Sequence, residues 1–215
     1  MALIKAMVLT LGLLSSGVVM AERELTVYGG GQTTPHSNVH VTDTAGSSTF
    51  PTSWQGKSWQ MPPYYGLRYT AWLNEDWGYA INFTHAKAKA NPVERDIGGY
   101  SVLEFTDGAN PLTLVSMRRF ETIAGFRPHA GLGLGVSFPH VEVEKTSGGV
   151  KTFGYQYGGP VVTALGGFSY DLNERWRLLT EFQFHYLKLN VRVDGGRLKT
   201  NLITNAINIG ASYRF

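Results

Sequence analysis

Histidine and carboxylate side chains gather in the segments that separate apolar, alternating stretches of the sequence. The residues of this kind are His36, His40, His85, Glu104, Asp107, His140 and Glu142. Imidazole and carboxylate together can bind a divalent cation or act as an acid and a base. His140 and Glu142 are two residues apart, so an extended backbone places both on one side, which favours joint ligation.

Each histidine also has a plain structural interpretation. His40 lies in a polar segment, which is typical of a solvated side chain. His129 and His185 fall on the inner face of predicted strands and are interpreted as interior groups. A ligand role and a structural role both stay open for the other three, His36, His85 and His140.

Eight stretches alternate apolar and small or polar residues with the period of two that a strand requires. The predicted strands are 22–31, 64–73, 77–84, 113–119, 127–138, 161–170, 176–186 and 201–215. Short turns alternate with three long segments, 32–61, 86–111 and 139–159. Long segments without a period are unusual inside a compact soluble domain. Outside a membrane barrel they are ordinary, so we predict them to be extracellular loops.

The bulky face of the predicted strands carries almost no charge, and aromatic residues mark both strand ends. A soluble lipocalin-like barrel would turn this face inward, whereas a membrane barrel turns it toward lipid. We therefore predict an all-β fold, an eight-stranded antiparallel transmembrane β-barrel with short periplasmic turns and long extracellular loops. Side chains would fill so narrow a lumen. Its predicted inner charges are Arg68, Arg118, Arg177 and Glu181, with Glu181 paired to arginine.

Residues 1–21 have the pattern of a secretory signal peptide, with one lysine, an apolar run and small residues before the cleavage point. We predict a single barrel domain, 22–215, in the outer membrane of a Gram-negative bacterium. The absence of cysteine fits an exported protein. The balance of 19 basic and 16 acidic residues does not indicate nucleic-acid binding, but it suits contact with lipopolysaccharide and outer-membrane lipids. The last strand ends on Tyr213 and Phe215, which resembles the signal read by barrel-assembly machinery.

Six segments at the predicted extracellular rim resemble the lipid A oxidase family. They are 34–37 (TPHS), 61–68 (MPPYYGLR), 83–87 (FTHAK), 103–108 (LEFTDG), 139–143 (PHVEV) and 198–206 (LKTNLITNA), and the similarity runs from about residue 24 to residue 215. The resemblance implies an outer-membrane enzyme that oxidises the proximal glucosamine of lipid A to 2-aminogluconate. Oxygen would be the oxidant, hydrogen peroxide the by-product and a divalent cation a helper. It assigns no catalytic residues, so the site is predicted from the rim side chains alone.

Such an oxidation needs a base for the anomeric hydroxyl and a group that activates oxygen. We predict that His36, His140 and Glu142 bind a divalent metal ion. Asp107 or Glu104 would be the base, and His85 is a further catalytic candidate. The predicted substrate-binding residues are Lys87, Tyr155, Arg197 and Lys199, the cations holding lipid A phosphates. No flavin or nicotinamide fingerprint occurs, and neither cofactor is expected.

Two other functions are compatible with the same sequence. One is a non-enzymatic barrel that is structural or contacts lipopolysaccharide, like the transmembrane domain of outer membrane protein A. The other is a conduit for small hydrophobic compounds. Rim histidines that converge would favour the enzyme, and histidines that point apart would favour the structural role. A continuous dry channel through the wall would favour the conduit.

Overall fold

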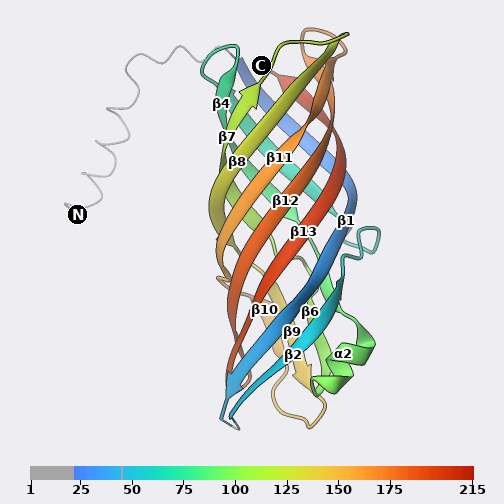
Figure 1. Ribbon diagram of the computed structural model, residues 1–215, viewed down its shortest axis with the longest axis vertical. Helices are drawn as coiled ribbons and strands as arrows, with labels where there is room; N and C mark the ends of the chain where they lie inside the picture. The colour runs from blue at the N-terminus through green and yellow to red at the C-terminus, as the bar shows by residue number, and fades with distance from the viewer. Residues whose placement is uncertain (1–21, 45) are drawn as a thin grey trace, which may run out of the picture.

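Eight antiparallel strands close into a barrel in the computed structural model, which describes residues 22–44 and 46–215 (Figure 1). In chain order the barrel strands are β1 (Glu22–Asp43), β3 (Tyr65–Trp72), β4 (Trp77–His85), β7 (Pro111–Arg119), β8 (Phe126–Ser137), β11 (Gly159–Asp171), β12 (Trp176–Val193) and β13 (Gly196–Arg214). Pairing of β1 with β3 closes the ring. The predicted fold class is confirmed. The predicted signal peptide lies outside the described residues.

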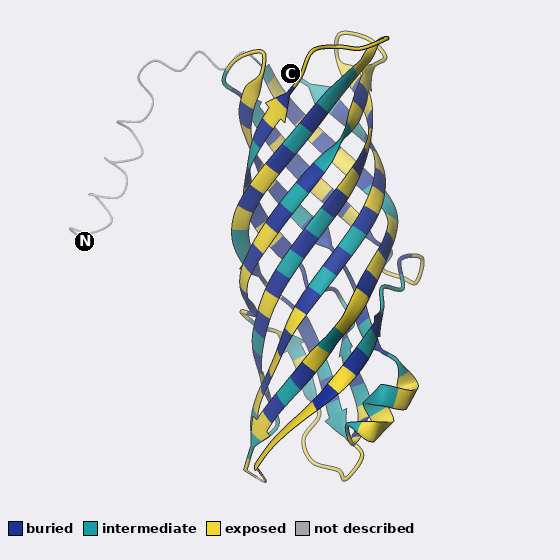
Figure 2. Ribbon diagram, viewed as in Figure 1, coloured by how far each residue is buried: buried dark blue, intermediate teal, exposed yellow. Residues whose placement is uncertain are grey.

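Apolar side chains cover the outside of the barrel in the half that contains the C-terminus. Leu132 and Leu134 on β8 are 70% and 69% exposed, and Ile207 and Ile209 on β13 are 66% and 73% exposed. Figure 2 shows exposed and buried positions alternating along these strands. Each such side chain gains about 1.5–3 kcal/mol on leaving water, so the belt places the barrel in the outer membrane.

In the described part of the chain, no helix is long and apolar enough to cross a membrane.

Charges inside the membrane half are paired. Arg68 donates two hydrogen bonds to Glu181, at 2.9 and 2.5 Å, and His129 Nε2 lies 3.3 Å from the same carboxylate. Near the periplasmic end, Arg177 forms ion pairs with Glu24 and Asp171. The predicted pairing of Glu181 with arginine is confirmed.

The facing predicted for the fourth barrel strand is wrong. Arg118 lies outside, where its guanidinium is 4.9 Å from the Trp77 ring centroid, and Val115 and Met117 are buried inside. The inward positions of β8 opposite them are glycines. A Cβ at Gly131 would lie within 2.8 Å of Val115 and Met117 side-chain atoms, so these apolar side chains fill the space that glycine leaves. Trp72, one of the aromatic residues expected to mark the strand ends, also packs inside with Val115 and Met117.

The long segments are ordered rather than structureless, which corrects a second prediction. Strands β1, β12 and β13 continue past the membrane, and five further strands and a helix join them. These are β2 (Gly46–Gln55), β5 (Ala88–Ala90), α2 (Pro92–Ile97), β6 (Tyr100–Phe105), β9 (His140–Lys145) and β10 (Thr152–Tyr155). The order β10-β9-β6-β5-β2-β1 extends the barrel wall outward. We call this part the extracellular lobe; it lies at the bottom of Figure 1.

Apolar side chains mostly point outward, toward lipid, in the membrane half and inward in the lobe. Along β12, Gln183 and His185 point inward in the membrane half, whereas Leu187 and Leu189 point inward in the lobe. The lobe's inner residues form one apolar cluster from β1, β2, β6, β9, β12 and β13. The inversion follows the solvent, because lipid surrounds one half and water the other.

Side chains fill the interior of the described barrel. Beside Arg68 and His129 lies a cavity of about 20 Å³, which is room for roughly one water molecule. Beyond it the apolar cluster closes the lobe. The described interior is therefore a core rather than a pore.

Candidate functional site

Seven of the ten predicted site residues meet on the outer face of the wall, where the membrane half joins the lobe. The strand register brings them together. Lys89 on β5 lies opposite Glu104 on β6, and Glu104 lies opposite Glu142 on β9, so their side chains share the outer face. Their neighbours Leu103 and Val143 lie in the apolar cluster inside. We call the outward set the rim cluster: His85, Lys87, Glu104, Asp107, His140, Glu142 and Tyr155.

His85 ends β4 on its outward face. Its ring stacks on Tyr65 at 5.2 Å between centroids, and its Nδ1 lies 3.1 Å from Asn110 Oδ1. Its Nε2 is buried and makes no hydrogen bond of ordinary geometry to the described residues, although the Pro62 backbone lies close enough to the ring to favour its charged form. A ring that is held on one side and unpartnered on the other can accept or donate a proton to a ligand.

His140 begins β9, with its ring edge against two aromatic rings. Centroid distances are 4.6 Å to Phe153 and 4.8 Å to Tyr155. Its Nδ1 lies 3.9 Å from Asp107 Oδ2, too far for a hydrogen bond, and this buried nitrogen also has no partner among the described residues. Asp107 is the carboxylate best placed to share a proton with it.

The turn at Gly108 joins the two histidines. Its carbonyl accepts a hydrogen bond from the His140 backbone N–H at 3.0 Å. Its φ is +85°, and an added Cβ would lie 2.8 Å from His85 Nδ1 and 2.4 Å from Asn110 Oδ1. Glycine is required here, because any side chain would meet both strain and a clash.

The two glutamates of the rim cluster are already engaged. Glu104 forms an ion pair with Lys89 at 3.0 Å, and Glu142 accepts from Thr106 at 2.5 Å and from Lys151 at 2.6 Å. Burial by itself would raise the pKa of Glu142, but the Lys151 ammonium and the Thr106 hydroxyl lower it overall. Thr106, Lys89 and Lys151 were missed as site residues, because a strand pairing rather than a sequence pattern brings them there.

Lys87 holds a loop instead of presenting a free charge. Its Nζ donates to the carbonyls of Gln60 and Met61 at 3.2 and 2.8 Å, and the residue is 8% exposed. Burial lowers the pKa of Lys87, although Asp107 and Glu104 oppose the shift. The loop it holds, 56–64, projects sideways from the wall (Figure 1). Trp59 and Met61 on it are 80% and 83% exposed, which suits contact with lipid headgroups.

The predicted metal triad is not assembled. His140 and Glu142 lie on β9, whereas His36 is exposed on β1, four strand spacings away in the sheet, or roughly 19 Å along the wall. Among the described residues, no group of three histidine, cysteine, aspartate or glutamate side chains is placed to hold a metal ion. The donors present therefore do not fit the predicted metal.

The other two predicted cations, Arg197 and Lys199, lie on β13 and are separated from the rim cluster by β1, β2, β5 and part of the lobe. Both are exposed on the outer face. They belong to a different surface of the protein.

No family model matches the sequence, and no curated protein matches it. Several solved structures have the same fold. The outer membrane protein OprG from Pseudomonas aeruginosa aligns with a TM-score of 0.54 at 14% identity, covering 91% of this chain and 97% of that one. Neisserial surface protein A aligns with a TM-score of 0.51 at 14% identity, covering 90% and 97%. Outer membrane protein AlkL, solved in lipid bilayers, aligns at 0.50 and 16%, covering 94% and 93%. At these identities the likeness shows the barrel fold.

Proposed function

We propose that the protein is a lipid A-modifying oxidase that converts the proximal glucosamine of lipid A to 2-aminogluconate at the rim cluster. The observation that carries the proposal is the pair of histidines on either side of the 106–110 turn. Each has a buried ring nitrogen without a partner in the described structure, and Asp107 lies beside one of them. Buried polar atoms are normally satisfied. His185 Nε2 in the barrel interior also lacks a partner among the described residues, but His85 and His140 lie on the outer face of the wall, where a ligand could reach them.

The position of the rim cluster suits a lipid headgroup as substrate. It lies on the outside of the wall, next to the outward ring of Tyr65 and the projecting Trp59. A lipid in the outer leaflet would bring its sugar to this height while its acyl chains stay against the apolar belt. A soluble substrate would not need a site on this face.

The chemistry is a two-electron oxidation at the anomeric carbon. Asp107 takes the proton of the anomeric hydroxyl, and the imidazoles of His85 and His140 hold the sugar oxygens. The C1–H bond breaks as the carbonyl forms. The C1 hydrogen with its electron pair, together with the proton taken by Asp107, reduces one molecule of oxygen to hydrogen peroxide. The described residues of the rim cluster supply the base and the sugar contacts, and the group that activates oxygen is not among them. Water then opens the lactone to the acid. The anomeric hydroxyl must be free, so lipid A phosphorylated at this carbon would not react.

A non-enzymatic barrel that contacts lipopolysaccharide is the second candidate. The ion pairs of Glu104 and Glu142 favour it, because they give these carboxylates a structural role. The conduit has less support, since the described interior is filled.

Mass spectrometry of lipid A from an expressing host that lacks the activity tests the proposal. Expression should add one oxygen to the proximal sugar. We expect Asp107→Asn and His140→Ala to lose at least about 100-fold of this product, the usual contribution of a general base. His36→Ala is the matched control and should retain it, because His36 lies outside the rim cluster. Heat-modifiable mobility on gels would verify folding. Unmodified lipid A from the folded parent, under aerobic conditions with a free anomeric hydroxyl, would exclude the oxidase.

A further inference from the structure

Cations form a column on the outer face of the β12–β13 hairpin. The outward cross-strand pairs beyond the membrane are Lys188 with Asn201, Asn190 with Lys199, and Arg192 with Arg197. We call these six residues the cationic column. It holds four positive charges and two amides, and no acidic side chain, in a chain whose charges are otherwise nearly balanced.

Two of these cations face each other directly. Arg192 and Arg197 occupy opposite positions of an antiparallel pair, where like charges are destabilising. Arg197 Nε and Nη2 bond to Asn190 at 2.7 and 3.0 Å, which fixes its guanidinium and leaves Nη1 available. The Arg192 guanidinium has no acidic partner among the described residues. A bound anion would offset the repulsion between the two guanidinium groups and accept hydrogen bonds from both.

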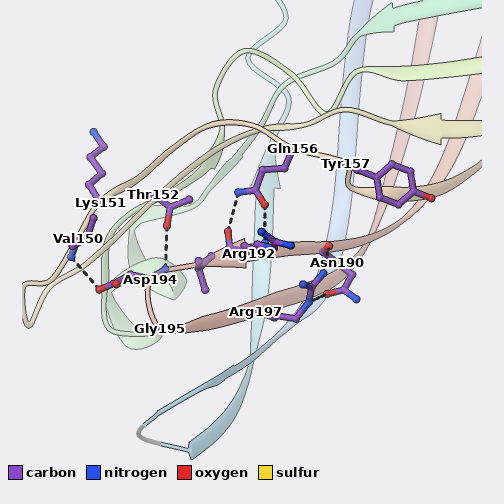
Figure 3. A pocket seen from close by; sticks show the side chains of 11 residues that line it. Val150, Lys151, Thr152, Gln156, Tyr157, Asn190, Arg192, Asp194, Gly195 and Arg197 are labelled. Atoms are coloured by element: carbon purple, nitrogen blue, oxygen red, sulfur yellow. Dashed lines mark hydrogen bonds between the residues drawn. The ribbon is translucent and has the colours of Figure 1, made fainter.

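A cleft of about 700 Å³ opens beside this pair, between the 150–157 segment and the hairpin (Figure 3). Hydrogen bonds of Gln156 to the Arg192 backbone, and of Val150 N–H to Asp194, hold its walls together. Asp194 is thereby engaged with backbone. Tyr157, 61% exposed, offers a ring face on which a sugar could stack. A second hollow of about 300 Å³ continues toward the membrane past Lys188, Lys199 and His40.

We propose that the cationic column binds the phosphate- or carboxylate-bearing sugars of an anionic glycolipid of the outer leaflet. The column starts two residues beyond the outward ring of Tyr186 and extends about 13 Å along the strand. That is the depth of the headgroup layer and of the first sugars above it. Arginine forks, amides and an exposed tyrosine match anionic sugars in both charge and shape. The neighbouring outward groups on β1 are His40 and Thr42, which hydrogen-bond to each other, so no lysine or arginine widens the stripe there.

This site is independent of the proposed oxidase. It lies on β12 and β13, while the rim cluster lies on β4, β6, β9 and β10. A column variant should therefore still oxidise a lipid A that has no core sugars, and His140→Ala should still bind glycolipid through the column.

Binding of core-bearing lipopolysaccharide to the full-length mature protein in zwitterionic nanodiscs tests the column. Each basic residue near an anionic surface contributes about a fivefold change in affinity, so Arg192→Gln with Arg197→Gln should weaken binding by roughly 25-fold. Lys57→Gln with Arg95→Gln removes two other extracellular cations and should leave binding unchanged. Without lipopolysaccharide the column variant should unfold at the same temperature as the parent or higher, since it lacks the like-charge pair.

Inorganic phosphate and a soluble anionic oligosaccharide distinguish the source of the anion. We expect both to compete only weakly with the membrane-anchored glycolipid. Equal affinity for the soluble oligosaccharide would overturn the membrane assignment. Equal lipopolysaccharide binding by parent and column variant, or an equal loss in the control pair, would overturn the site itself.

Discussion

Arg68 and Glu181 illustrate at the scale of single residues how the barrel carries charge inside a membrane. The two side chains are 3% and 0% exposed and join through two hydrogen bonds, with His129 as a third partner. Burial makes each charge costly without the other. The pair therefore enforces a single arrangement of the strands around it, β3, β8 and β12.

Replacing only Arg68 or only Glu181 should destabilise the protein far more than replacing both. Arg68→Met leaves a buried carboxylate and should lower the free energy of unfolding by about 3–5 kcal/mol. Arg68→Met with Glu181→Leu should recover most of that loss, because no unpaired charge remains. Urea unfolding in detergent measures both. Equal destabilisation by the single and double variants would mean that the packing of Arg68, not its charge, matters.

Glu142 gives the lobe a dependence on pH. Its pKa is held below the ordinary value by Lys151 and Thr106. Because the folded pKa is the lower one, the stabilisation is present above the ordinary value of 4.5 and is lost as pH falls through the folded value. We expect the protection factors of the β10 amides, which compare exchange with the intrinsic rate at each pH, to fall as the pH drops below about 4.5, and Glu142→Gln to show low protection at every pH. Unchanged β10 protection across this range in the parent would contradict the prediction.

At the scale of elements, the membrane strands could be predicted from sequence and the lobe could not. A period of two in 127–138 identifies both the strand and its lipid face, because the pattern is local. The strands β5, β6, β9 and β10 have six residues or fewer. The lobe is joined by pairing of β2 with β5 and of β6 with β9, which are far apart in sequence. The facing of β7 was missed because glycines on the neighbouring strand decide it.

The rim cluster depends on the same non-local pairing. Proximity of Asp107 to His140 follows from the β6–β9 register, which no spacing in the sequence reveals. His36 was grouped with them only because it too follows an apolar stretch. Which histidines belong together is therefore a property of strand order.

The 106–110 turn can be tested as an element. Gly108→Ala should cost about 1–2 kcal/mol in backbone strain and also push the His85 ring, so the oxidation should fall with the stability. Gly99→Ala is the matched control, since Gly99 has φ of +80° but open space around it. It should lose similar stability and keep activity. Equal activity losses in the two variants would remove the turn from the site.

At the scale of the whole molecule, one continuous wall encloses two different cores. The membrane half is filled by polar networks and a small apolar cluster that includes Trp72, Val115 and Met117, and the lobe by a larger apolar cluster. We therefore expect the lobe to unfold locally while the membrane half stays folded.

Leu189→Asn tests this division. Leu189 is 1% exposed within the apolar cluster, so the substitution should destabilise the lobe by about 3 kcal/mol or more. Proteolysis should then cut the extracellular segments, while the membrane half keeps its heat-modifiable mobility. Asn190→Asp, on the opposite face, is the control and should resist the protease. Loss of the whole barrel in Leu189→Asn would show that the halves fold as one unit.

The inversion of β12 has a consequence for how the protein sits in the bilayer. On the outer face Phe182 is followed four residues later by Tyr186 and then by Lys188. A displacement of two residues along the strand, about 7 Å, would sink Lys188 to the depth of the Tyr186 ring or lift Phe184 to that depth. Both displacements are therefore unfavourable, so the barrel is held at one depth in the bilayer and moves little along the membrane normal. A fixed height means that the rim cluster meets every passing lipid at the same depth, and that a thinner or thicker leaflet would change which part of the headgroup it can reach.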